Sequence, residues 1–194
     1  MAFVLATANP GKISEMREIL SGLGFEVVTR DELGIDIEVE ETGATFAENA
    51  LLKAAAICKA TGLPAIADDS GLMVDALDGE PGVYSSSYGG EGLSDSEQCL
   101  YLINAMKNME QRSAKFVCTI VCAFPDGSIL SAVGECHGEI LYAPQGSGGF
   151  GYDPVFVVGN LGKPMAELTL EEKNRVSHRG AALREFAAIL EKRQ

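Results

Sequence analysis

A short apolar run that ends in two adjacent carboxylates, at residues 65–71 (AIADDSG), constrains the fold of this chain most strongly. Apolar residues that lead directly into acidic ones are typical of a buried strand, whose C-terminal end delivers its carboxylates to a ligand-binding crevice of an open α/β sheet. Asp68 and Asp69 repel each other, so a cation such as Mg2+ or paired lysines would be needed to keep both ionised. The alternative is that the two residues only open a turn before Gly71.

Length and charge narrow the class of protein. The chain has 194 residues, a length that suits one domain, or one domain with two lobes. Its net charge is -13. Its lysines and arginines form no cluster, and this disfavours duplex nucleic acid as a partner. No apolar segment approaches about 20 residues and the N-terminal apolar run is too short for a signal peptide, so we expect no membrane span.

The cysteines indicate a reducing compartment. Their number is odd and they lack CxxC spacing, which argues against a disulfide framework and against zinc. The four-residue separation of Cys118 and Cys122 puts both on the same face of one predicted strand. We therefore expect buried free thiols and a cytoplasmic protein. The five cysteines are Cys58, Cys99, Cys118, Cys122 and Cys136.

The order of the predicted elements indicates an α/β protein with a mixed, partly antiparallel central sheet flanked by helices, in two lobes with a cleft between them. A first part alternates strands and helices, and a second part begins with a helix and continues with antiparallel strands and a closing helix. Capping boxes at Thr45 and Ser94 begin two of the helices. Strands are expected at 3–6, 25–29, 63–67, 72–74, 114–124, 129–136, 139–142 and 155–158, and helices at 13–23, 46–61, 94–109, 168–174 and 180–191.

Two segments could hold a phosphate. In TANPGK, residues 7–12, Asn9 is a good N-cap and Pro10 suits the first helical position, so free backbone N–H groups would face an anion beside Lys12. Lys53 lies about two turns into the helix that follows Glu40 and Glu41 and could reach a phosphate as well. The alternatives are an ordinary strand-to-helix turn and a solvated helical lysine.

Two further segments could hold a base. The glycine-rich stretch 146–154 (GSGGFGYDP) allows backbone to approach a flat ligand closely, and an aromatic ring within it could stack on a base. Residues 172–180 (EKNRVSHRG) bring Lys173, His178 and Arg179 together as donors for carbonyl or phosphate oxygens. The alternatives are a flexible connection with core aromatics, and a structural histidine.

Together and in this order, these segments resemble the inosine/xanthosine triphosphate pyrophosphatase family. The resemblance spans nearly the whole chain. One local difference is Ala8, which stands where glycine is frequent among relatives. The segments that carry it are TANPGK (7–12), ETGATFAENALLKA (41–54), AIADDSGL (65–72), GGFGYDP (148–154), AELTLEEKN (166–174) and SHRG (177–180).

The resemblance implies one pyrophosphatase domain over residues 1–194, with a cleft between two lobes, and a homodimer. It implies Mg2+-dependent hydrolysis of the deaminated purine nucleotides ITP, dITP and XTP to a monophosphate and pyrophosphate. Two alternatives remain: a non-catalytic nucleotide-binding sensor, and a pyrophosphatase for another modified nucleotide. Loss of Asp69 or Lys12 would favour the sensor, and both residues are present.

The resemblance also assigns roles to individual residues. Asp69 would be the catalytic carboxylate that positions the attacking water, and it would share the metal with Glu40. Asp68 and Glu41 would support them, and Ser70 would contact the substrate. The triphosphate would be held by Thr7, Ala8, Asn9, Pro10, Gly11, Lys12, Lys53 and Lys173, and the base by Phe150, Gly151, Tyr152, Asp153, His178 and Arg179.

Overall fold

The computed structural model describes residues 2–192. Within them the chain forms two compact units, and each is described by itself. The first unit comprises the chain up to Asp69 together with 118–134 and the residues from 178 onwards, and the second comprises 70–117 and 135–177. Among the described residues, no helix is both long and apolar enough to cross a membrane.

The strands form a mixed sheet, as predicted. Their hydrogen-bonded order is β2-β1-β3-β4-β5-β6-β7. β1 pairs in parallel with β2 and β3, and β6 pairs antiparallel with β5 and β7. The expectation of an α/β protein with a partly antiparallel sheet is thus confirmed. The strands are β1 (Ala2–Leu5), β2 (Glu26–Thr29), β3 (Ala65–Val74), β4 (Ser113–Ala123), β5 (Ile129–Ile140), β6 (Phe156–Val158) and β7 (Lys163–Pro164).

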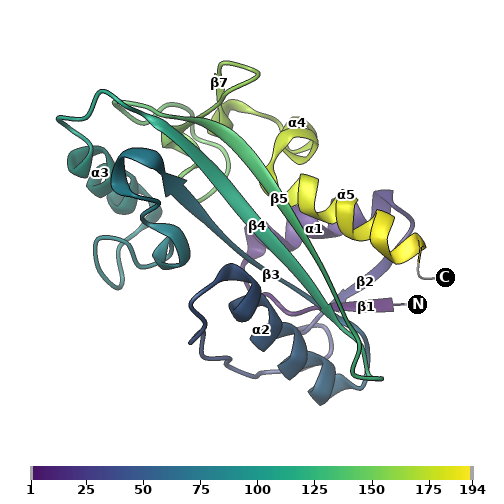
Figure 1. Ribbon diagram of the computed structural model, residues 1–194. Helices are drawn as coiled ribbons and strands as arrows, with labels where there is room; N and C mark the ends of the chain where they lie inside the picture. Colours follow the sequence, from purple (N-terminus) through teal and green to yellow (C-terminus); the bar gives the residue numbers. More distant parts are fainter. Residues whose placement is uncertain (1, 193–194) are drawn as a thin grey trace. The chain divides into compact units, whose positions relative to one another are not determined.

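Helices cover both faces of the sheet in the first unit (Figure 1). Alternate residues of a strand point to opposite faces, so Phe3 and Leu5 pack in one hydrophobic cluster, with α1 and α5, while Val4 packs in another, with α2. The layers are therefore helix, sheet and helix, and they decide which helix each β3 side chain can meet. The helices of this unit are α1 (Pro10–Gly22), α2 (Phe46–Thr61) and α5 (His178–Glu191).

The two predicted capping boxes are confirmed. The Thr45 side chain accepts the N–H of Glu48, whose side chain accepts the N–H of Thr45, which is a complete capping box at the start of α2. Ser94 and Glu97 form the same motif at α3 (Asp95–Ala105). Such boxes satisfy orphan N–H groups of the first turn, which explains why they predict helix starts well.

The second unit encloses its own hydrophobic core. Leu72 of β3, Leu102 of α3, Phe116 of β4 and Phe156 of β6 are buried together there. The unit also contains α4 (Leu170–Val176). α3 ends at Ala105, four residues earlier than the predicted end at 109.

The structure corrects two strand predictions. β3 runs without a break from Ala65 to Val74, so Asp68 and Asp69 lie within a strand and not in an acidic turn at its end. β5 likewise joins the two strands predicted at 129–136 and 139–142. Gly138 lies between the two predicted strands, and a Cβ there would lie 2.0 Å from the carbonyl oxygen of Val157. Glycine thus lets β5 and β6 approach each other within a continuous strand.

Candidate functional site

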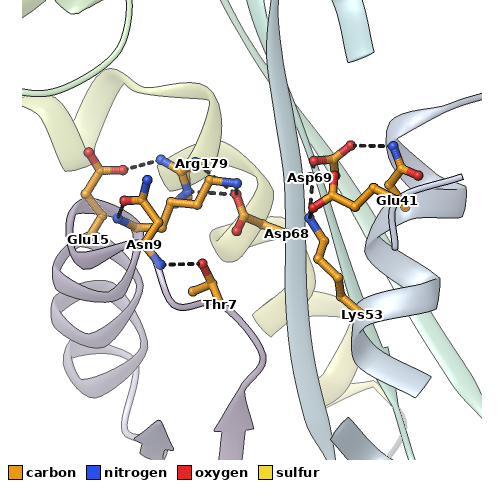
Figure 2. Close-up of polar contacts among 10 residues, drawn as sticks. Thr7, Asn9, Glu15, Glu41, Lys53, Asp68, Asp69 and Arg179 are labelled. Atoms are coloured by element: carbon orange, nitrogen blue, oxygen red, sulfur yellow. Dashed lines mark hydrogen bonds and ion pairs between the residues drawn. The ribbon is translucent and has the colours of Figure 1, made fainter. Parts of the chain in front are cut away.

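Asp68 and Asp69 lie on opposite faces of β3 (Figure 2). The even-numbered Ile66 packs with α1 and α5, while Ala65 and Ala67 pack with α2. Asp68 accordingly faces α1 and α5, and Asp69 faces α2. The mutual repulsion expected of neighbouring carboxylates is therefore reduced by geometry, and each carboxylate has cationic partners of its own.

On the α2 face, Asp69 contacts two side chains of that helix. The Nζ of Lys53 lies 3.2 Å from Oδ1 of Asp69, and Nδ2 of Asn49 donates to Oδ2 at 3.2 Å. Lys53 also pairs with Glu41 at 3.1 Å. The alternative of a solvated helical lysine is wrong, because only 13% of the Lys53 side chain is exposed.

Burial shapes the protonation of this group. It raises the pKa of Asp69 above the ordinary value, and the nearby Lys53 opposes that shift while Glu41 adds to it. Burial alone would lower the pKa of Lys53, but the charges of Asp69, Asp68 and Glu41 outweigh it and leave the pKa raised. A carboxylate with a raised pKa, held beside a protonated lysine, is suited to accept a proton from water.

On the α1 and α5 face, Asp68 belongs to a buried cluster of balanced charge. Lys12 lies 3.0 Å from Oδ2 of Asp68, and NH2 of Arg179 lies 2.9 Å from the same oxygen. Arg179 also binds the buried Glu15 of α1. Burial would raise the pKa of Asp68, but the charges of Lys12 and Arg179 hold it well below the ordinary range.

The loop from β1 to α1 has the geometry expected of an anion-binding turn. Oδ1 of Asn9 accepts the N–H of Lys12 at 3.1 Å, and Pro10 occupies the first turn of α1. The N–H of Asn9 donates to Oγ1 of Thr7 at 3.2 Å. The cap prediction is confirmed. Ala8, Asn9 and Pro10 are exposed. Pro10 has no N–H, and the N–H groups of Lys12 and Ile13 already bond Asn9, so the first turn of α1 can offer the N–H of Gly11 to a ligand.

The second unit brings together Phe150 and Asp153, which were expected to hold the base, and Lys173, which was expected to hold the triphosphate. Nζ of Lys173 lies 2.5 Å from Oδ2 of Asp153 and 4.4 Å from the centre of the Phe150 ring. Asp153 also accepts the N–H of Phe150 at 2.9 Å. The hydroxyl of Tyr152 donates to the carbonyl of Ser85 at 2.8 Å, so this ring belongs to the core. Phe150 is only half-buried, so its ring is the one of the two that a ligand could reach.

The remaining predicted residues are divided between the units. Glu40 is exposed in the loop before α2, and Ser70 is half-buried on β3. His178 and Arg179 are buried at the start of α5, in the first unit, whereas Phe150 and Lys173 belong to the second. A base site that includes Phe150, His178 and Arg179 stays a prediction.

Sequence reasoning missed Asn49 and Glu15. Both are buried polar residues that contact the site, at 3% and 2% exposure. A signal for Asn49 was present, because it lies one helical turn before Lys53 on α2 and so shares its face. Glu15 similarly lies one turn after Lys12 on α1.

The donor set suits a hard divalent ion that also binds substrate. Among residues 2–192 no group of three or more His, Cys, Asp or Glu side chains is arranged to hold a metal. Mg2+ does not require such a cage, because it binds through one or two carboxylates plus phosphate oxygens. Asp69, with Glu40 and Glu41 in the loop before α2, offers carboxylates of this kind.

A mixed α/β fold that gathers carboxylates, lysines and an open helix start in this way is suited to a phosphorylated ligand. The model of the Ham1 family matches residues 3–189, and the chain belongs to this family. The dITP/XTP pyrophosphatase of a Thermus thermophilus strain is 54% identical over 193 residues, covering 98% of this chain and 91% of that protein.

A further relative and a solved structure are similar to this chain over nearly its whole length. The dITP/XTP pyrophosphatase of Geobacter sulfurreducens is 52% identical over 182 residues, covering 93% of this chain and 92% of that protein. The solved structure of the Staphylococcus aureus Ham1 protein has a TM-score of 0.89 and 44% identity, and 100% of each chain is covered. The resemblance to the triphosphate pyrophosphatases is thereby confirmed.

Proposed function

We propose that this chain, as a single domain over residues 1–194, hydrolyses the deaminated purine nucleotides ITP, dITP and XTP to a monophosphate and pyrophosphate. Such a reaction removes damaged purines from the nucleotide pool. The observation that carries the proposal is the buried Asp69, held between Asn49 and Lys53 beside the acidic loop that precedes α2. Relatives that are 54% and 52% identical bear the name dITP/XTP pyrophosphatase, which supports the same substrates here.

Asp69 is the catalytic carboxylate in this proposal. It positions the attacking water and accepts its proton. Glu40 and Asp69 would hold Mg2+, with Glu41 beside them; a bound Mg2+ neutralises phosphate charge. No nucleophilic cysteine or serine is required, because phosphoryl transfer depends mainly on positioning and charge neutralisation.

The triphosphate is held by cationic and backbone donors. The loop 7–12 presents the N–H of Gly11 at the start of α1, with Lys12 beside it. Lys53 and Lys173 supply further positive charge, and Ser70 contributes its hydroxyl. Lys12 and Lys53 are anchored by Asp68 and Asp69, so both are held in place before a nucleotide arrives.

The base is selected by its 6-oxo group. Donors at the start of α5 face O6 in this proposal: the His178 ring and backbone N–H groups of that helix. The guanidinium of Arg179 itself is engaged by Asp68 and Glu15. Adenine carries an amino group at this position and would leave the donors unpaired, which can discriminate by a factor of about 10^4. Guanine shares the 6-oxo group, so rejection of GTP requires a further interaction that acts against its 2-amino group. The 150–153 segment, with the Phe150 ring, packs against the base.

The proposal extends to cell context and assembly. We place the enzyme in the cytoplasm as a homodimer, acting on small-molecule nucleotides and not on nucleic acid or membranes. Five free, buried cysteines support a reducing compartment. A net charge of -13 supports the exclusion of nucleic acid.

Product analysis tests the function directly. With Mg2+ present, ITP, dITP and XTP are expected to yield monophosphate and pyrophosphate, while ATP and GTP stay nearly intact; chromatography identifies the products. The Asp69→Asn variant is the inactive control, and EDTA should stop turnover. Release of orthophosphate would contradict the proposed cleavage site. Turnover of dUTP alone would instead favour a pyrophosphatase for another nucleotide, and tight ITP binding without turnover would favour a sensor.

A further inference from the structure

Helix α2 holds both oxygens of the Asp69 carboxylate. Lys53 contacts Oδ1 and Asn49 contacts Oδ2, each at 3.2 Å. The two side chains lie four residues apart on α2, so they share one face of the helix, and both contact Asp69 of β3. Figure 2 shows Lys53 beside Asp69. The lysine supplies charge, and the amide supplies a directed donor.

The other end of the Asn49 amide is also occupied. Its Oδ1 accepts the N–H of Gly43 at 2.8 Å. A backbone N–H can only donate, so this contact fixes the orientation of the amide and turns Nδ2 toward Asp69. Asparagine has low helix propensity, and this one is 3% exposed, so neither propensity nor solvation accounts for its place in α2.

Asn49 and Lys53 bridge the same two parts of the chain. Each contacts Asp69 on one side and the loop before α2 on the other, Asn49 through Gly43 and Lys53 through Glu41. A Cβ on Gly43 would lie 2.7 Å from Oδ1 of Asn49, so the loop comes this close only because glycine stands there. The same loop carries Glu40.

We propose that Asn49 is a positioning residue for the hydrolysis: its amide fixes the orientation of the Asp69 carboxylate and ties it to the loop that carries Glu40 and Glu41. The inference rests on the proposed function. An ion pair with Lys53 alone restrains one oxygen, whereas two contacts on two oxygens restrain rotation of the carboxylate plane. A displacement of about 1 Å in such a group can cost about 100-fold in rate.

Two substitutions separate the contacts of Asn49. Asn49→Ala removes both hydrogen bonds. Asn49→Asp keeps the size and the acceptor for Gly43, but places a carboxylate against Asp69 where the donor was. The matched control is Glu48→Ala, at the neighbouring position. The Glu48 side chain accepts the N–H groups of Ala44 and Thr45, so it caps the helix and does not hold the Asp69 carboxylate.

The measurements are kcat and KM for ITP with Mg2+, the melting temperature, and calorimetric binding of an ITP analogue whose α- and β-phosphates are joined by nitrogen. Both Asn49 variants are expected to lose about 10- to 100-fold in kcat. Their KM and the affinity for the analogue should stay within about threefold, because Asn49 restrains a reacting group and not the nucleotide. Glu48→Ala should lower the melting temperature and leave kcat within about twofold.

The possible results distinguish failure of the positioning role of Asn49 from failure of the proposed hydrolysis. If the wild-type protein turns over none of ITP, dITP and XTP, the proposed function fails and the role of Asn49 fails with it. If the wild type is active and Asn49→Asp retains its kcat, the positioning role alone is overturned. An equal loss of kcat in Glu48→Ala would also overturn it. Should Asn49→Ala fail to fold, Asn49→Asp decides the matter.

Discussion

Arg179 is the residue whose role changes most between sequence and structure. Its place in SHRG suggested a donor aimed at the base, but its guanidinium is 1% exposed and engages both Asp68 and Glu15. With Lys12 it balances two buried carboxylates by two cations. Charges in such a cluster are tolerated because each has partners, and removing one leaves others buried without compensation.

Arg179→Ala is therefore expected to lower the free energy of unfolding by about 3–5 kcal/mol. Urea denaturation at neutral pH measures it. Arg175→Ala is the matched control, because Arg175 pairs with Glu171 on the exposed surface of α4. That pair should contribute less than about 1 kcal/mol. Similar losses in the two variants would contradict the structural role of Arg179.

At the scale of elements, the close packing of α5 on β5 depends on one glycine. A Cβ on Gly134 would lie 2.2 Å from the carbonyl oxygen of His178 and 2.3 Å from the nitrogen of Ala182. Both are backbone atoms and cannot move aside as a flexible side chain would. Because position 134 of β5 has no side chain, the first turn of α5, which holds His178 and Arg179, can pack directly on this strand.

Gly134→Ala should destabilise the protein by about 1–3 kcal/mol, since α5 must shift to make room for the methyl group. Gly22→Ala is the comparison: a Cβ at the end of α1 meets nothing within 4 Å. That change should be neutral or stabilise by up to about 1 kcal/mol. Chemical denaturation of both variants checks the prediction, and an unchanged midpoint for Gly134→Ala would show that α5 is not seated so closely.

At the scale of the whole molecule, the cysteines report on the integrity of both units. All five are free and buried, and Cys118 and Cys122 share one hydrophobic cluster, as their spacing predicted. Burial raises the pKa of Cys99 to about 12 and that of Cys136 to about 11. Deprotonation is therefore displaced well above neutral pH, and the reactive thiolate is scarce.

The native protein should consequently resist thiol reagents at pH 8, where a thiol of pKa about 12 is ionised to roughly one part in 10^4. Titration with a disulfide reagent should find nearly no reactive thiol in the native state and five after unfolding in guanidinium chloride. In Cys99→Ala the unfolded count should fall by one. Rapid reaction of any thiol in the native protein would contradict the burial of the five cysteines.

Local patterns were sufficient for much of the fold. The capping boxes of Thr45 and Ser94 and the Asn9 cap predicted helix starts correctly, because these interactions lie within a few residues of each other. Short apolar runs likewise predicted most strands of the mixed sheet, although not β7. Local patterns failed at 68–69, where the acidic residues suggested a turn, and between 136 and 139, where two strands were predicted and one continuous strand is found.

By itself the sequence determined the kinds of element and most of the chemical groups of the site, since both depend on neighbouring residues. Only the tertiary structure decided that Asp68 and Asp69 face different helices and so have separate partners. The partners come from distant segments, Arg179 for Asp68 and Lys53 with Asn49 for Asp69. A strand can carry adjacent carboxylates through its interior only when packing on both faces supplies such partners, and no local pattern encodes that packing.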